Sequence, residues 1–120
     1  MKKIMIVDDS AYMRGNIRGM LKHAGFETFI EAANGTQAVE QYIKERPAVT
    51  ILDITMQGMD GLQALKTIMA VDSQAKIIMC TAISQESIMV QAMSDGARDY
   101  IVKPFDASRL IEAVKEHMSE

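Results

Sequence analysis

The sequence predicts an α/β protein with a doubly wound, five-stranded parallel sheet. Five short apolar segments each precede an amphipathic one, and turn-forming residues separate the pairs. The apolar segments are continuous runs with no polar alternation, which indicates strands covered on both faces. Right-handed crossovers between parallel strands place helices on both sides of the sheet.

Turn and cap signals divide the chain into these elements. The expected strands span residues 3–7, 27–32, 48–52, 76–80 and 100–102. The expected helices span residues 11–24, 36–45 and 62–71, followed by one that Ser84 caps and that runs to about residue 95, and one that Asp106 caps. Asp9 or Ser10 can cap the first helix, and Gly25 ends it.

Apolar stripes on the helices predict which side chains enter the core. These residues are Met13, Ile17, Met20, Leu21, Ala24, Ala38, Val39, Tyr42, Ile43, Leu65, Ile68, Met69, Leu110, Ile111, Val114 and Met118. Gly15 and Gly19 interrupt the first helix, where each costs about 1 kcal/mol relative to alanine. Close approach of a neighbouring element would explain them.

Length and composition favour one globular domain, residues 1–120. The hydrophobic fraction is 48%, which argues against disorder. A net charge of −3 gives no general attraction to nucleic acid or to an anionic membrane, and no apolar run reaches transmembrane length. The N-terminal apolar run is too short for a signal peptide. The single cysteine, Cys80, excludes an internal disulfide and fits a reducing cytosol, so we expect a cytoplasmic protein with an inert, buried thiol.

Polar residues follow four of the expected strands. Asp8 and Asp9 end the first strand, Asp53 the third, Thr81 the fourth and Lys103 the fifth. The carboxyl ends of parallel strands share one edge, where ligands of open α/β sheets bind. If these strands are neighbours, three carboxylates, a hydroxyl and an ammonium group meet there.

Each of these groups has a use in phosphoryl transfer. Clustered carboxylates favour a hard cation, and Mg²⁺ needs only one or two carboxylates besides waters and phosphate oxygens. Lys103 supplies a point charge for a phosphoryl group, and the Thr81 hydroxyl can donate to one of its oxygens. No histidine or cysteine nucleophile lies near this edge, so Asp53 is the candidate nucleophile.

At these residues the sequence resembles the receiver domain of two-component response regulators. The matching segments are VDDS at 7–10, LDITM at 52–56, MDG at 59–61, TA at 81–82 and YIVKPF at 100–105. The resemblance covers essentially the whole chain and implies a flavodoxin-like fold with strand order 2-1-3-4-5. Segments 10–14 and 97–114 look most like stand-alone chemotaxis regulators of the CheY type.

The resemblance implies a phosphoacceptor regulator that catalyses only its own phosphorylation and dephosphorylation. Asp53 matches the residue that accepts phosphate from a histidine kinase. Asp8 and Asp9 match residues that help hold Mg²⁺ with Asp53, and the backbone carbonyl of Thr55 matches a further ligand.

The resemblance also implies a route from the phosphoryl group to the surface. Lys103 and Thr81 match the pair that senses the phosphoryl group, and Tyr100 matches an aromatic residue that turns inward on activation. Lys103-Pro104 matches a peptide bond that is cis in the family.

The chain departs from the family pattern at a few positions. Gln57 stands where proline is usual, which loosens the loop after Asp53. Thr55 and Ile83 occupy positions that tune the attack of water on the phosphorylated aspartate. Because an isoleucine side chain cannot orient water, we expect slow self-dephosphorylation unless a partner phosphatase supplies the missing group.

The expected output is contact with another protein. A chemotaxis regulator of this type would bind, as a monomer, a flagellar switch protein through the fourth helix, fifth strand and fifth helix. A phosphorelay intermediate would share the same receiver residues.

Two alternatives come from other classes of protein. A flavodoxin-type FMN carrier needs a hydroxyl- and glycine-rich loop after the first strand, where this chain has Asp8 and Asp9. A phosphatase of the haloacid dehalogenase kind needs two aspartates spaced two apart, whereas Thr55 stands two residues after Asp53.

Overall fold

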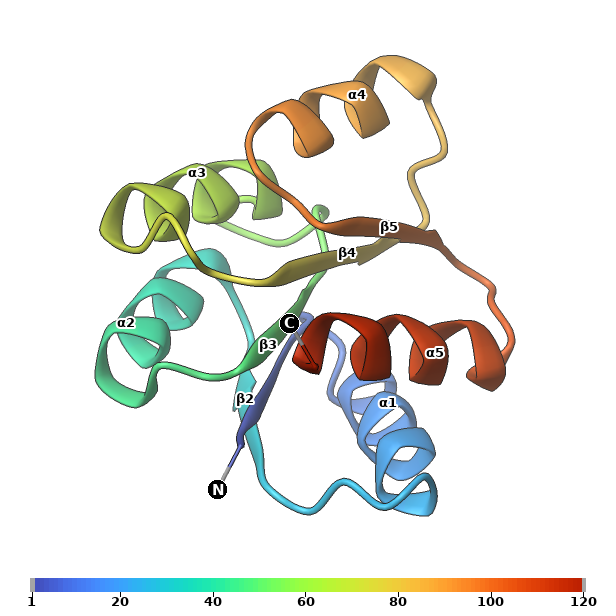
Figure 1. The fold of residues 1–120 in the computed structure, drawn as a ribbon. Coiled ribbons are helices and arrows are strands. Elements are labelled where there is room, and N and C mark those ends of the chain that lie inside the picture. The colour runs from blue at the N-terminus through green and yellow to red at the C-terminus, as the bar shows by residue number, and fades with distance from the viewer. Residues whose placement is uncertain (1, 120) are drawn as a thin grey trace.

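The fold is a parallel sheet between two layers of helices, seen in a computed structural model that describes residues 2–119. The strands are β1 (Ile4–Val7), β2 (Phe29–Ala32), β3 (Val49–Leu52), β4 (Ile77–Thr81) and β5 (Asp99–Val102). The helices are α1 (Ala11–His23), α2 (Gly35–Glu45), α3 (Gly61–Val71), α4 (Glu86–Ser94) and α5 (Ala107–Met118). Strands pair in parallel in the order β2-β1-β3-β4-β5, so the predicted fold class is confirmed (Figure 1).

The two faces of the sheet carry two separate cores. Helices α1 and α5 cover one face, and α2, α3 and α4 cover the other (Figure 1). Successive strand side chains point to opposite faces. Ile4 and Ile6 of β1 therefore pack in the core under α1 and α5, while Met5 and Val7 pack on the other side. Burial on both faces explains why the strands are continuous apolar runs.

The prediction that Ile43 faces the core is wrong, since its side chain is 52% exposed. Helix α2 buries Ala38 and Tyr42, which stand four residues apart on one face. Ile43 lies about 100° further around the helix, because an α-helix has 3.6 residues per turn. This rotation of about 100° places the Ile43 side chain outside the interface between α2 and the sheet.

Two predicted helix caps also need correction. Helix α4 begins at Glu86 with Gln85 as its N-cap residue, so Ser84 lies one position too early to cap it. Ile83 accounts for this offset, because hydrogen bonds to Thr81 and Tyr100 hold its backbone in the loop. Asp106 does occupy the N-cap position of α5, but within residues 2–119 its side chain makes no capping hydrogen bond.

The glycines of α1 do not mark a close approach, contrary to the prediction. A Cβ atom added at Gly15 or Gly19 would have no atom of the described chain within 4 Å, outside its own helix backbone. Both positions are solvent-exposed. Across residues 2–119, no helix is long and apolar enough to cross a membrane.

Candidate functional site

The sheet brings the carboxyl ends of β1, β3, β4 and β5 side by side. Two backbone hydrogen bonds continue the pairing one residue beyond the strands. The Asp53 amide donates to the Val7 carbonyl at 3.0 Å, and the Lys103 amide donates to the Thr81 carbonyl at 2.8 Å. Asp53 is therefore fixed relative to β1, and Lys103 is fixed relative to β4.

An acidic cluster forms where β1 and β3 end. Asp8, Asp9 and Asp53 each offer a carboxylate oxygen, and these oxygens lie within 4.8 Å of one another. Asp8 and Asp53 are buried, whereas Asp9 is exposed. Backbone amides hold the two buried carboxylates, because Ser10 donates to Asp8 Oδ1 at 2.9 Å and Ile54 donates to Asp53 Oδ1 at 2.7 Å.

Lys103 reaches into this cluster from β5. Its Nζ lies 2.7 Å from Asp8 Oδ2 and 3.3 Å from Asp53 Oδ2. Burial favours the neutral amine, but the hydrogen bond to Asp8 and the negative charges of Asp53 and Asp8 outweigh it and raise the pKa of Lys103 above its usual value. The ammonium group is thus charged at neutral pH and stands beside the candidate nucleophile.

The donor set fits Mg²⁺. Three carboxylates face one ammonium group, which leaves an excess of negative formal charge that a divalent cation would offset. All the side-chain donors are hard oxygens, and the exposure of Asp9 leaves room for the waters that Mg²⁺ retains. The Thr55 amide lies 3.4 Å from Asp53 Oδ1, which places that residue beside the cluster. The role of its carbonyl as a ligand stays a prediction.

The loop after Asp53 has to pass very close to its own backbone. The Gly61 amide donates to the Ile54 carbonyl at 2.8 Å. A Cβ atom added at Gly61 would collide with the carbonyl of Asp53 and would lie 2.6 Å from the Ile54 Cα. Glycine at this position is therefore what allows α3 to begin directly beside the candidate nucleophile.

Thr81 and Tyr100 converge on one residue of the loop after β4. The Ile83 amide lies 3.4 Å from Thr81 Oγ1, and the Tyr100 hydroxyl donates to the Ile83 carbonyl at 2.8 Å. Thr81 is fully buried, and Tyr100 is 8% exposed, so the tyrosine ring points inward in this structure. Burial, followed by the charge of Asp53, raises the pKa of Tyr100. Sequence reasoning did not anticipate that the Ile83 backbone joins these two side chains, since a backbone contact leaves no residue-type signal.

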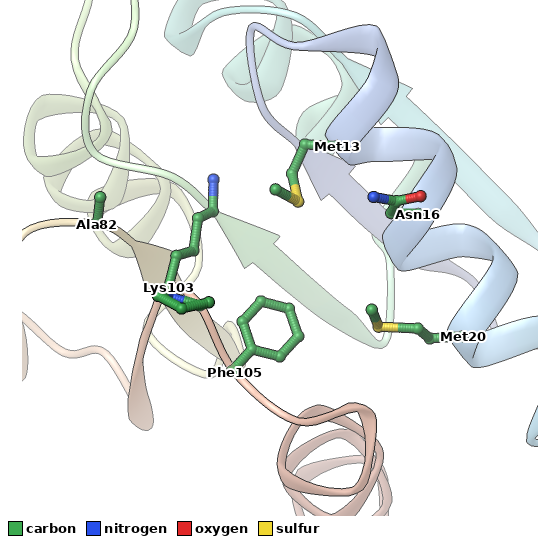
Figure 2. Close-up of a pocket in the computed structure, with 7 residues that line it drawn as sticks. Met13, Asn16, Met20, Ala82, Lys103 and Phe105 are labelled. Atoms are coloured by element: carbon green, nitrogen blue, oxygen red, sulfur yellow. The ribbon is translucent and has the colours of Figure 1, made fainter.

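An apolar cavity of about 410 Å³ adjoins Lys103 between α1 and the segment after β5. Figure 2 shows Met13 and Met20 extending from α1 toward Phe105, with Ala82 on the far side of Lys103. The Lys103-Pro104 peptide bond at its edge is cis, as the resemblance implied. Met13 and Met20 were expected in the core, and they are half-buried because they line this cavity.

Residues 4–115 match the response regulator receiver domain family. The chain belongs to this family. It is 49% identical to the chemotaxis protein CheY of Bacillus subtilis (strain 168), over 117 residues and 98% of each chain. It is 35% identical to sporulation initiation phosphotransferase F of the same organism, over 98% of this chain and 94% of that one.

Solved structures agree with this assignment. The chain matches a structure of the CheX–CheY–BeF₃–Mg²⁺ complex from Borrelia burgdorferi with a TM-score of 0.92 and 32% identity, covering 96% of this chain and 87% of that one. The receiver domain is therefore a phosphorylation-activated signalling switch of a two-component system, and the CheY relatives support a role in chemotaxis. Family membership decides against the FMN carrier and the haloacid dehalogenase phosphatase.

Proposed function

We propose that Asp53 accepts a phosphoryl group from the phosphohistidine of a kinase. The observation that carries this proposal is the position of the Asp53 carboxylate, buried at the end of β3 and facing Lys103 Nζ at 3.3 Å. A carboxylate oxygen of Asp53 attacks phosphorus, the bond from phosphorus to the histidine nitrogen breaks, and the imidazole leaves. Phosphoryl transfer of this kind depends mainly on positioning and on charge neutralisation.

The neighbouring residues supply both requirements. Backbone amides fix Asp53 Oδ1, and Lys103 offers a positive charge beside Oδ2. Asp8, Asp9 and Asp53 would hold Mg²⁺, with the Thr55 carbonyl as a further ligand. When bound, Mg²⁺ neutralises charge on the transferring phosphoryl group.

The signal would leave the site through Thr81 and Tyr100. A phosphoryl group adds about −1.5 to −2 charge near neutral pH, which attracts Lys103 and the Thr81 hydroxyl. The Ile83 backbone already contacts both Thr81 and Tyr100, so a shift of Thr81 would change the strength with which Tyr100 is held inward. Lys103→Ala should therefore accept a phosphoryl group but fail to raise the affinity of the protein for its target, measured by titrating target with phosphorylated protein.

The output surface would be the α4–β5–α5 face. Val90 and Met93 of α4 are 60% and 45% exposed, which gives this face apolar side chains for a partner protein. For a chemotaxis regulator the partner is a flagellar switch protein, with a phosphatase to end the signal. We propose that this receiver domain acts as a monomer in the cytoplasm, without binding nucleic acid or inserting into a membrane.

Intact-mass measurement with a small acyl phosphate and Mg²⁺ tests the phosphoacceptor. The wild type should gain one phosphoryl group and Asp53→Asn should gain none. Asp106→Asn is the matched control, because it removes an exposed carboxylate that makes no capping hydrogen bond among residues 2–119. Labelling of Asp53→Asn at the wild-type level would overturn the assignment.

A phosphorelay role is the second candidate, supported by the similarity to sporulation initiation phosphotransferase F. Its distinguishing property is transfer of the phosphoryl group from Asp53 to a second histidine protein. Capture of a flagellar switch protein by the phosphorylated form favours chemotaxis. Loss of label to a histidine phosphotransfer protein, without such capture, favours the phosphorelay.

A further inference from the structure

The side chain of Arg14, in α1, hydrogen-bonds the backbone of Asp8 at the acidic cluster. Its Nη1 donates to the carbonyl oxygen of Asp8 at 2.6 Å, and its Nε donates to Glu31 Oε1 of β2 at 2.9 Å. The side chain is only 17% exposed. The second carboxylate oxygen of Glu31 pairs with Arg18, one turn further along α1. Arg14 is thus held between β2 and the peptide that joins Asp8 to Asp9.

The hydrogen bond from Arg14 influences the acidic cluster because it orients the peptide bond between Asp8 and Asp9. The Asp8 carbonyl belongs to the planar unit that also contains the Asp9 amide, so fixing the oxygen fixes the plane between the two residues. Asp8 has further anchors, since its carboxylate accepts from the Ser10 amide and from Lys103. Asp9 is exposed, and the orientation of the peptide before it helps set the direction in which its side chain leaves the backbone.

We infer that Arg14 is a positioning residue for the divalent-cation site, holding the Asp8–Asp9 peptide so that both carboxylates face the same point. This inference rests on the proposed Mg²⁺-dependent phosphorylation of Asp53. Glu31 has a supporting part: it orients the guanidinium and offsets its positive charge, which would otherwise repel a cation bound at the acidic cluster.

The direction in which Arg14→Ala changes the Mg²⁺ affinity distinguishes a positioning role from a purely electrostatic one. If Arg14 acted only as a nearby positive charge, Arg14→Ala would remove a repulsion and Mg²⁺ would bind more tightly. If Arg14 positions the turn, the same substitution weakens binding. Loss of a residue that orients metal ligands typically lowers metal affinity about 10- to 100-fold, and we expect the lower end because Asp8 keeps its other anchors.

Arg18 provides the matched control. It lies on the same helix and pairs with the same glutamate, but its side chain is 45% exposed, and within residues 2–119 it pairs with no carboxylate other than Glu31. Arg18→Ala removes the same charge and leaves the contact between Arg14 and Asp8 in place. Its Mg²⁺ affinity should stay within about twofold of wild type, as expected for a screened surface charge.

The experiment is calorimetric titration of the full chain with Mg²⁺, paired with phosphorylation rates from acyl phosphate over a range of Mg²⁺ concentrations. For Arg14→Ala, the Mg²⁺ concentration giving half-maximal rate should rise about tenfold, while the rate at saturating Mg²⁺ returns toward wild type. A purely structural role would lower the melting temperature without moving this midpoint. Arg14→Lys keeps the charge but loses the fork that bridges Asp8 and Glu31, so it should show most of the same shift.

Several results would overturn the inference. Unchanged or tighter Mg²⁺ binding by Arg14→Ala, with the wild type binding and reacting normally, refutes positioning and leaves the proposed function intact. A wild type that neither binds Mg²⁺ nor is phosphorylated refutes the proposed function and this inference together. If Arg14→Ala does not fold, the same measurements are made on Arg14→Lys and Glu31→Gln. The inference is refuted if both variants reach half-maximal phosphorylation rate at the wild-type Mg²⁺ concentration.

Discussion

Gly61 offers the most direct test of how tightly the loop after Asp53 is built. Alanine at this position places a methyl carbon 2.6 Å from the Ile54 Cα and in collision with the Asp53 carbonyl. Ordinary carbon–carbon contacts lie at about 3.5–4.0 Å, so the backbone must move by about 1 Å. The colliding atoms belong to the backbone, which cannot step aside as a flexible side chain would.

The expected magnitude follows from comparing two identical substitutions. Overpacking of this kind costs about 1–3 kcal/mol, so Gly61→Ala should lower the free energy of unfolding by that amount. At exposed Gly15 the added methyl meets open space, and Gly→Ala within a helix should raise the free energy of unfolding by about 1 kcal/mol. The two variants should therefore differ by about 2–4 kcal/mol with opposite signs.

Urea unfolding of both variants measures this difference, with an unchanged slope expected if both remain two-state. The Asp53 backbone moves in Gly61→Ala, so its phosphorylation rate should also fall, by up to about 100-fold for a displacement near 1 Å. Gly15→Ala should react like wild type. Equal stability and equal rates in the two variants would show that the close approach at Gly61 does not exist.

Three further predictions concern other parts of the chain. Burial acts to raise the pKa of Asp99. Hydrogen bonds from Arg109 and from the Tyr100 amide, together with the charge of Arg109, outweigh burial and lower this pKa below its usual value. Asp99→Asn should therefore reduce stability above about pH 4, and the difference from wild type should shrink as pH falls through the folded-state pKa; a pH-independent difference in urea unfolding would contradict this. Burial raises the pKa of the Cys80 thiol to about 12, so iodoacetamide at pH 8 should alkylate it only after unfolding, and rapid labelling of the folded protein would disprove its burial. Ile83→Glu should speed loss of the phosphoryl group after the donor is removed, because a carboxylate can accept a proton from the attacking water; an equal or slower loss would show that Ile83 does not control water access.

Local sequence patterns determined the elements of this protein. Helices and strands depend on the spacing of apolar residues and on turn signals, and the observed bounds differ from the expected ones by one or two residues. The parallel sheet followed as well, because strands that are apolar on both faces must be covered on both. The candidate site could be predicted for the same reason, since strand ends in a parallel sheet necessarily share an edge.

Tertiary structure decided the features that depend on how helices pack against the sheet and its loops. Ile43 belongs to an apolar stripe in the sequence, yet α2 packs through Ala38 and Tyr42 and leaves Ile43 exposed. Ser84 has the right residue type for a cap, but contacts from β4 and β5 to Ile83 delay the start of α4. A helix cap such as Ser84 is worth only about 1 kcal/mol, which docking contacts readily exceed.

No local sequence pattern predicts the contacts that complete the site. Lys103 meets Asp8 across 95 positions of sequence, and the guanidinium of Arg14 reaches the carbonyl of Asp8, a group that every residue possesses. The sequence by itself determined which side chains would stand at the strand ends. Only the packed sheet and its helices decided the distances between them and the backbone groups they hold, because those depend on the mutual fit of elements far apart in the chain.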